Sequence, residues 1–168
     1  MAFEPVFQTT PHLLKVLEDI SALNARIQNA TVGVSWVPAL QRDAAARQTH
    51  GSTAIEGNPL TLAEVKILAE GGHLPHAKPR AVQEVLNYFA ALRFIEKNAQ
   101  AKEVHVRDVL KLHSIIGQKG ALDREPVGLF RPYQVRVGMH LPPKASEVPG
   151  LMSQLLEWLN GAGRAWPA

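Results

Sequence analysis

The feature that most constrains the fold is an apolar spacing of three and four residues, which recurs along the chain between glycines and prolines. Such spacing places the apolar side chains on one face of an α-helix. Thr10 and Pro11 before the first such stretch are typical of a helix N-cap and first turn. We therefore expect a helix over residues 10–30, with these residues on its apolar face: Leu13, Val16, Leu17, Ile20, Leu23 and Ile27.

The same spacing, together with residues that typically begin or end helices, predicts five further helices. Thr61 and Glu64 form the pattern of a capping box, in which each residue satisfies a backbone N–H of the other. Gly71 and Gly72 would end that short helix, and Asn160 and Gly161 would end the last one. The expected helices cover residues 38–55, Thr61 to about Leu68, residues 80–97, residues 105–117, and a final helix capped by Ser146.

Only one stretch departs from helical texture. Residues 129–137 alternate loosely and are rich in β-formers, and Gly138 with Pro142 and Pro143 closes them. This pattern predicts a short β-hairpin. The expected fold is therefore mainly α-helical with one hairpin, organised as an N-terminal helical part over residues 1–60 and a second part over residues 61–168.

Composition narrows the class of protein. The chain has 168 residues, 46% of them hydrophobic, which suffices for one ordinary domain. Because it has no cysteine, it can form neither a disulfide nor a thiolate zinc site, and a cytoplasmic location fits best. No apolar run approaches the length of a membrane helix, so we expect no membrane contact. With 18 basic against 15 acidic residues and no clustered bases, nucleic acid is an improbable partner.

Glu56 stands where a helix favours a cation. Gly57, Asn58 and Pro59 mark the end of the helix over residues 38–55, which leaves Glu56 near the negative end of its macrodipole. The cost is a few tenths to about 1 kcal/mol, and a charged partner could offset it. Ser52 lies one helical turn earlier and could orient the carboxylate by a hydrogen bond.

The sequence around Glu56 resembles the Fic (Fido) family. Ser52-x-x-x-Glu56-Gly57 is similar to the family's inhibitory motif [S/T]-x-x-x-E-[G/N], and the longer run S-T-A-I-E-G-N-P-L-T is also close. Gly128-Leu-Phe130-Arg131, followed by Gln134-Val135-Arg-Val137-Gly138, looks like the family's flap, and residues 149–160 look like the helix after it. The order and spacing match over roughly residues 35–161, which implies a helical Fic-like domain with a hairpin flap.

The resemblance implies a function for each motif. Family members transfer AMP from ATP to hydroxyl side chains of target proteins, with Mg²⁺, and the inhibitory glutamate pairs with an arginine that otherwise binds the γ-phosphate. Ser52, Glu56 and Gly57 would then be the inhibitory motif. The flap would add a target segment to its edge through Phe130, Arg131 and Val135. The residues expected near the nucleotide are Val137, Gly138, Met139 and His140.

The family's catalytic motif, H-P-F-x-[D/E]-G-N-G-R, is not in the sequence. None of the seven histidines is followed by Pro-Phe, and Asn160-Gly-Ala-Gly-Arg164 is better explained as a helix end than as a phosphate loop. We expect the motif beyond Ala168, which would make this an incomplete domain. We therefore expect no catalytic residue and no metal ligand in this chain, and no strong ATP or Mg²⁺ binding by it alone.

Two rival interpretations remain open. The chain could be a non-enzymatic module that presents its inhibitory helix or flap to another Fic core, and the uncovered apolar surface of an incomplete core would then favour self-association. A basic helical protein that binds nucleic acid is the weaker rival, and it predicts binding that falls steeply with salt.

Overall fold

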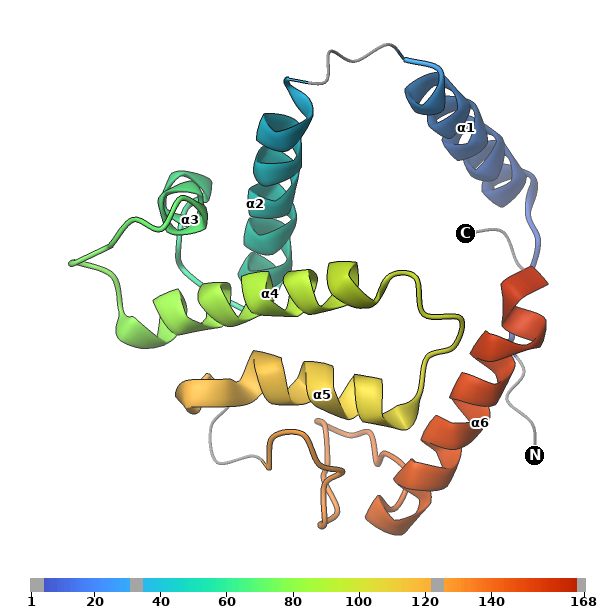
Figure 1. Ribbon diagram of the computed structural model, residues 1–168. Helices are drawn as coiled ribbons and strands as arrows, with labels where there is room; N and C mark the ends of the chain where they lie inside the picture. Colours follow the sequence, from blue (N-terminus) through green and yellow to red (C-terminus); the bar gives the residue numbers. More distant parts are fainter. Residues whose placement is uncertain (1–4, 31–34, 122–125, 166–168) are drawn as a thin grey trace. The chain divides into compact units, whose positions relative to one another are not determined.

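The computed structural model describes residues 5–30, 35–121 and 126–165. Figure 1 shows the helices that these residues form. They are α1 (Pro11–Gln28), α2 (Val37–Ile55), α3 (Leu62–Ala69), α4 (Pro79–Asn98), α5 (Val106–Gly117) and α6 (Val148–Asn160). The chain divides into two compact units, one up to Gln41 and one from Arg42 onward.

Helix α1 belongs to the first unit. Thr10 caps it, because the Leu13 N–H donates to Thr10 Oγ1 over 3.1 Å, and Pro11 fills its first turn. The predicted apolar face is present, yet no residue of α1 is buried.

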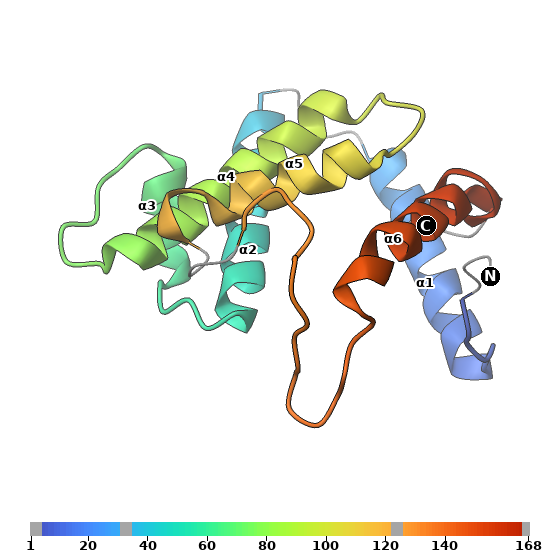
Figure 2. The same cartoon turned by 90° about the horizontal axis from the view of Figure 1, so that it is seen from below.

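Helix α4 is the central element of the second unit. It packs against α3 on one side and α5 on the other, and α5 also contacts α6 (Figures 1 and 2). The core lies where α3 and the end of α2 meet α4, and Val65 and Val85 are fully buried there. Its members are Ala46, Leu60, Val65, Leu68, Ala81, Val85 and Phe89.

The helical predictions are confirmed to within a few residues at each end. The Thr61–Glu64 capping box is formed, since the Thr61 N–H donates to Glu64 Oε2 over 2.7 Å and the Glu64 N–H donates to Thr61 Oγ1 over 3.3 Å. Gly161 ends α6 as predicted, and Ala162–Ala165 then forms a short 3₁₀ turn.

The predicted hairpin is wrong for the residues that the structure describes. Residues 126–143 contain no strand, and their only ladder contact is the isolated bridge between Val137 and His140. Pro132, Pro142 and Pro143 have no N–H to donate, so a regular ladder cannot form across them. The segment runs as an extended loop away from the helices (Figure 2).

The predicted cap of the last helix is also wrong. Ser146 lies inside a 3₁₀ turn, Ala145–Glu147, that leads into α6. The carboxylate of Glu147 replaces the serine as the local acceptor, because the Lys144 N–H donates to Glu147 Oε2 over 3.1 Å.

No helix in the described part of the chain is long and apolar enough to cross a membrane.

Candidate functional site

The end of α2 is a tightly hydrogen-bonded turn. The Asn58 N–H donates to the Thr53 carbonyl and the Gly57 N–H to the Ala54 carbonyl, both over 3.0 Å, which is the Schellman pattern. Gly57 supplies the positive φ, 87°, that this pattern requires. We call residues 52–58 the Glu56 turn, because they hold Glu56 directly after the last residue of the helix.

Asn58 fixes this turn to α4. Its side-chain Nδ2 donates to the Ala81 carbonyl over 2.9 Å and to Glu84 Oε2 over 2.8 Å. Its Oδ1 accepts the Leu60 N–H over 3.1 Å, and only 8% of the residue is exposed. Both polar atoms of the amide group therefore serve the junction, with Nδ2 using both of its hydrogens.

Ser52 is fixed to the same helix one turn further along. The Tyr88 hydroxyl donates to Ser52 Oγ over 2.8 Å, in a half-buried environment. Among the contacts of the described residues, no hydrogen bond joins Ser52 to Glu56, although the sequence left that option open. Thr53, the next residue, donates instead to the Thr49 carbonyl inside its own helix over 2.9 Å.

Glu56 is exposed between these two attachments. It lines a pocket of about 460 Å³. The pocket is walled by the end of α2, the first half of α4 and the end of α5, and its other lining residues are Ser52, Thr53, Arg80, Glu84, Tyr88, Ile116 and Ala121. Residues with two carboxylates, three hydroxyls and a guanidinium thus surround a space that a charged side chain could enter.

A glutamate followed by glycine at a helix end is not by itself unusual in this chain. Helix α3 ends in the same way, with Glu70 before Gly71 at a φ of 81°. The Gly72 N–H donates to the Ile67 carbonyl over 2.8 Å and the Gly71 N–H to the Leu68 carbonyl over 3.1 Å, so this end is also a Schellman motif. What distinguishes Glu56 is the pocket and the attachment to α4 on both sides of it.

The second candidate region is the loop that resembles a flap, residues 128–143, which we call the flap loop. Val137 and His140 exchange backbone hydrogen bonds over 3.0 and 2.9 Å around Gly138 and Met139. Gly138 has a φ of 58° and Met139 does not have a positive φ, which is the pattern of a type II′ turn. All four residues are exposed, and Met139 is 90% exposed.

Side chains hold the two arms of the flap loop together where a ladder is missing. Arg131 Nη1 donates to the Tyr133 carbonyl over 2.8 Å and Nη2 to the Pro143 carbonyl over 2.5 Å. Gln134 Nε2 reaches the Pro142 carbonyl over 2.9 Å. The guanidinium therefore replaces the N–H groups that proline cannot offer.

The flap loop is seated on α5 by a glycine. Gly128 has a φ of 74°, and a Cβ there would lie 2.9 Å from Ser114 Cβ. Its N–H donates to His113 Nδ1 over 3.2 Å, so the half-buried histidine serves as a packing residue. Next to this seat is an apolar pocket of about 510 Å³ between α5, the flap loop and α6, lined in part by Leu110, Phe130 and Met152.

An ion pair joins α3 to α2, and a capping box closes the start of α3. Lys66, followed by Arg47, lowers the pKa of the Asp43 carboxyl, at distances of 2.5 and 2.6 Å. The Thr61 N–H and then its hydroxyl lower the pKa of Glu64 by hydrogen bonding to its carboxylate. Both acids are therefore held in the charged form, which favours the α3 start at neutral pH.

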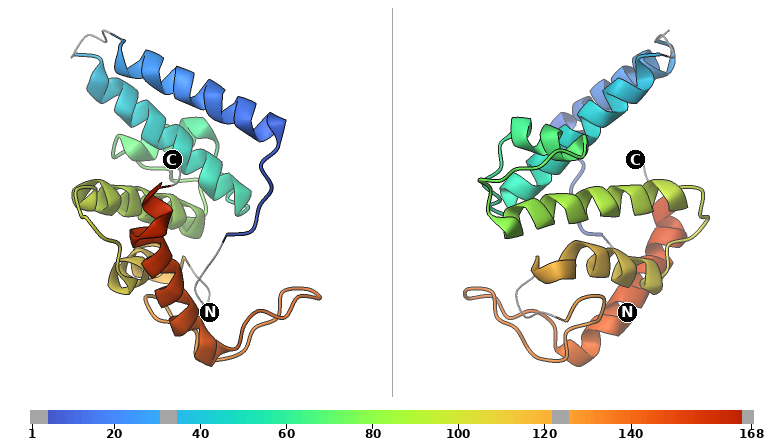
Figure 3. Two further views of the ribbon diagram at one scale, coloured as in Figure 1. Left: turned by 90° about the vertical axis from the view of Figure 1, so that its right-hand side faces the viewer. Right: turned by 60° about the vertical axis from the view of Figure 1, so that its left-hand side comes forward.

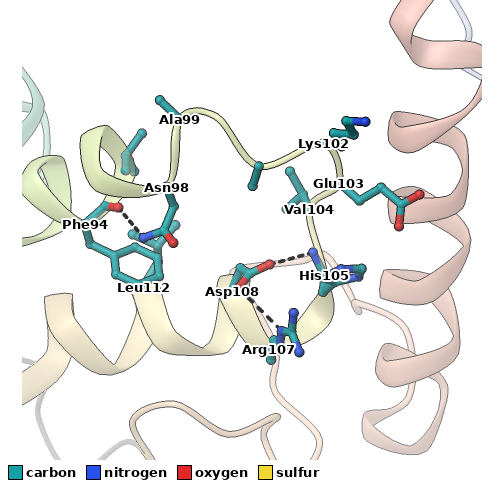
Figure 4. A pocket seen from close by; sticks show the side chains of 12 residues that line it. Phe94, Asn98, Ala99, Lys102, Glu103, Val104, His105, Arg107, Asp108 and Leu112 are labelled. Carbon is teal, nitrogen blue, oxygen red and sulfur yellow. Dashed lines mark hydrogen bonds and ion pairs between the residues drawn. The ribbon is translucent and has the colours of Figure 1, made fainter.

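The described residues do not fit a metal ion. Within 5–30, 35–121 and 126–165, no three histidine or acidic side chains come together as a ligand set. A third pocket of about 520 Å³ does gather polar groups where α4, residues 99–105 and α5 meet. Its carboxylates are those of Glu103 and Asp108. Figure 4 shows that Asp108 already accepts the His105 N–H, and that Asn98 donates to the Phe94 carbonyl.

Sequence reasoning missed the residues of α4 that complete the site. Glu84 and Tyr88 were not singled out, because neither lies in a motif and Tyr88 falls one residue before the apolar position Phe89. Asn58 was interpreted only as part of a helix stop. The signal that could have found them is the one-turn spacing of two polar residues, Glu84 and Tyr88, on a helix with an otherwise apolar face.

Comparison by sequence finds relatives that are named Fic adenylyltransferases. No family model matches the chain. The protein adenylyltransferase fic-1 of Caenorhabditis briggsae is 29% identical over 152 residues, which cover 88% of this chain and 29% of that protein. The protein adenylyltransferase Fic of Drosophila willistoni is 31% identical over 122 residues, which cover 71% of this chain and 24% of that protein. The chain thus spans less than a third of these relatives.

Comparison by structure agrees. A Fic family protein from Desulfovibrio desulfuricans G20 matches 95% of this chain and 48% of its own, with a TM-score of 0.78 and 28% identity. A Fic domain containing signaling protein from Bacteroides thetaiotaomicron matches 89% of this chain with a TM-score of 0.74 and 21% identity. The second likeness concerns the fold alone. Both neighbours share the helical arrangement described above.

Proposed function

Because the chain belongs to the Fic family by sequence and by fold, we propose that it is the inhibitory and target-binding part of a protein adenylyltransferase. Such an enzyme would transfer AMP from ATP to a hydroxyl side chain of a target protein. Glu56 would act as the brake, and the flap loop would position the target. The chain spans a minor part of its relatives, so the activity of the whole enzyme is part of this proposal.

The observation that carries the proposal is the presentation of Glu56. Its side chain is exposed, yet the turn below it is held to α4 by Ser52 and by Asn58. A carboxylate on a fixed turn beside a pocket can receive an arginine without first ordering its own backbone. In the complete enzyme that arginine would be the one that otherwise binds the γ-phosphate, so occupying it would block productive ATP binding.

The flap loop has the properties expected of a surface that positions a target. Its tip is exposed, and its form is fixed by hydrogen bonds within the loop, through Arg131 and Gln134. We propose that Phe130, Arg131 and Val135 bind the target segment or orient the loop that does, and that Val137, Gly138, Met139 and His140 lie near the nucleotide. The missing ladder implies that an extended target segment would pair with a loop edge rather than with a preformed strand.

ATP and Mg²⁺ would be required by the complete enzyme. Among the described residues, no group of three histidine or acidic side chains comes together. The contribution of this chain would be to bind the target, to limit access of the nucleotide and to hold the inhibitory carboxylate in place.

The test is AMP transfer from labelled ATP by this chain extended to include the catalytic motif. Replacement Glu56→Gly should raise the rate about tenfold or more, because a hydrogen bond between charged groups is worth roughly 1.5–3 kcal/mol. The matched control is Glu70→Gly, which removes the acid from the other Glu-Gly helix end and should leave the rate unchanged. Equal rates for the Glu56 variant and the parent protein would refute the brake.

A second candidate is favoured by the apolar pocket between α5, the flap loop and α6, together with the exposed apolar tip of the loop. These surfaces would let the 168-residue chain bind a separate Fic core or a second copy of itself. Sedimentation of the chain, alone and mixed with a Fic core, measures both. A monomer that does not bind the core removes this candidate.

A further inference from the structure

We infer that Tyr88 is the positioning residue of the inhibitory motif: its hydroxyl, through Ser52, holds the Glu56 turn in the orientation that presents Glu56 to the pocket. This inference rests on the proposed role of Glu56. Its structural half, the dependence of the turn on Tyr88, can be tested without any catalysis.

The first step is that the two attachments of the Glu56 turn come from one face of one helix. Glu84 and Tyr88 are one helical turn apart on α4, and they contact Asn58 and Ser52 respectively. These two contacts flank Glu56 in the sequence, four residues before it and two residues after it. A single helix therefore fixes the turn on both sides of the functional carboxylate.

The second step is that apolar packing does little to hold the end of α2. Ile55, the last residue of the helix, is 85% exposed, and Ala54, Glu56 and Gly57 are exposed as well. Thr53 is buried, but its hydroxyl bonds within α2. The orientation of the last helical turn therefore depends strongly on polar contacts with α4. Of these contacts, Tyr88–Ser52 is the one in which the bonded residue belongs to α2 itself.

The third step is that the two attachments are not equivalent. Asn58 is buried, and its contacts continue into the Leu60 backbone and the core, so its loss would disturb the fold. Tyr88 and Ser52 are half-buried and face the pocket that Glu56 lines. Removing one hydroxyl there leaves the tyrosine ring in place, so it can change the turn while the core persists.

The experiment is native-state amide hydrogen exchange of the 168-residue chain with Tyr88→Phe. We expect exchange at the amides of Glu56, Gly57 and Asn58 to become about fivefold faster, which is the factor that one ordinary side-chain hydrogen bond contributes to a local equilibrium. Exchange in α5 and α6 should not change. The control Ser153→Ala removes a hydroxyl that bonds within α6 and should leave the Glu56 turn untouched.

Two further variants distinguish positioning from general stability. Ser52→Ala should reproduce the effect of Tyr88→Phe, and the double variant should add nothing, because both remove one and the same hydrogen bond. An unchanged exchange rate at residues 56–58, additive effects, or an equal acceleration in every helix would each overturn the inference.

The functional half is read in the extended protein that carries the catalytic motif. Tyr88→Phe should raise AMP transfer severalfold, less than Glu56→Gly does, and should have no effect once Glu56 has been replaced. If Glu56→Gly releases transfer and Tyr88→Phe does not, the role of Tyr88 is wrong and the brake stands. If neither variant changes transfer while exchange at the turn is faster, the brake is wrong and the attachment stands.

Discussion

The Glu56 turn and the flap loop are both exposed, but they are held in opposite ways. The turn is fixed from outside itself, because Ala81 and Tyr88 of α4 form hydrogen bonds with its Asn58 and Ser52, which are buried and half-buried. The flap loop runs out from the helices (Figure 3). Beyond its seat at Gly128 it is fixed mainly from within, because Arg131 and Gln134 donate hydrogen bonds to its own carbonyls. A brake has to stay in register with a pocket, whereas a target-binding surface gains from adapting to what it binds.

The largest effect that would break this comparison is expected at Asn58. Replacement Asn58→Ala should lower the free energy of unfolding by about 2–4 kcal/mol, because it removes three hydrogen bonds at a buried junction and leaves the Leu60 N–H without its acceptor. Urea denaturation followed by circular dichroism measures it. The control Asn98→Ala loses one exposed bond to the Phe94 carbonyl and should cost less than about 1 kcal/mol. Equal losses would show that the turn is not fixed from α4.

A smaller and more local effect is expected in the flap loop. Replacement Arg131→Ala should speed cleavage of the loop severalfold by a protease that cuts after large apolar residues, since the two arms lose one of the side chains that connect them. The free energy of unfolding should change by less than about 1 kcal/mol, because the bonds are exposed and internal to the loop.

The matched control for that experiment is Arg136→Ala, which breaks only a bond to the Gly138 carbonyl near the tip. Its cleavage rate should stay close to that of the parent chain. If Arg131→Ala unfolded the whole unit instead, the flap loop would have to be counted as part of the core, and the contrast with the Glu56 turn would disappear.

The smallest effect is expected in the pH dependence of the stability that Glu64 contributes. The pKa of Glu64 is lowered in the folded chain, so its contribution to stability is present above the carboxyl's ordinary pKa and is lost as the pH falls through the folded value. Thermal unfolding of Glu64→Ala should therefore occur at a lower temperature than that of the parent at pH 6. The gap should narrow toward pH 3, and a gap that stayed constant would contradict the charged cap.

Local chemistry explains which of these features the sequence could predict. The helices followed from apolar spacing, and the Thr61–Glu64 box and the Gly161 end followed from capping rules that involve neighbouring residues only. The prediction of a hairpin was wrong for the flap loop because three prolines and the side chain of Arg131 determine its hydrogen bonds. Strand propensity alone does not take these into account. The attachment of Ser52 to Tyr88 joins residues 36 apart in the sequence, and only the packing of α2 on α4 brings them together.

The proposed brake requires that the Glu56 turn is already formed within these 168 residues. Amide exchange of the unaltered chain tests it directly. We predict that Gly57 and Asn58 exchange far more slowly than Val137 and His140, although all four amides bond to backbone carbonyls, because α4 holds the first pair. Equal, fast exchange at both pairs would contradict the account, since Glu56 would then sit on a turn that only a partner could order.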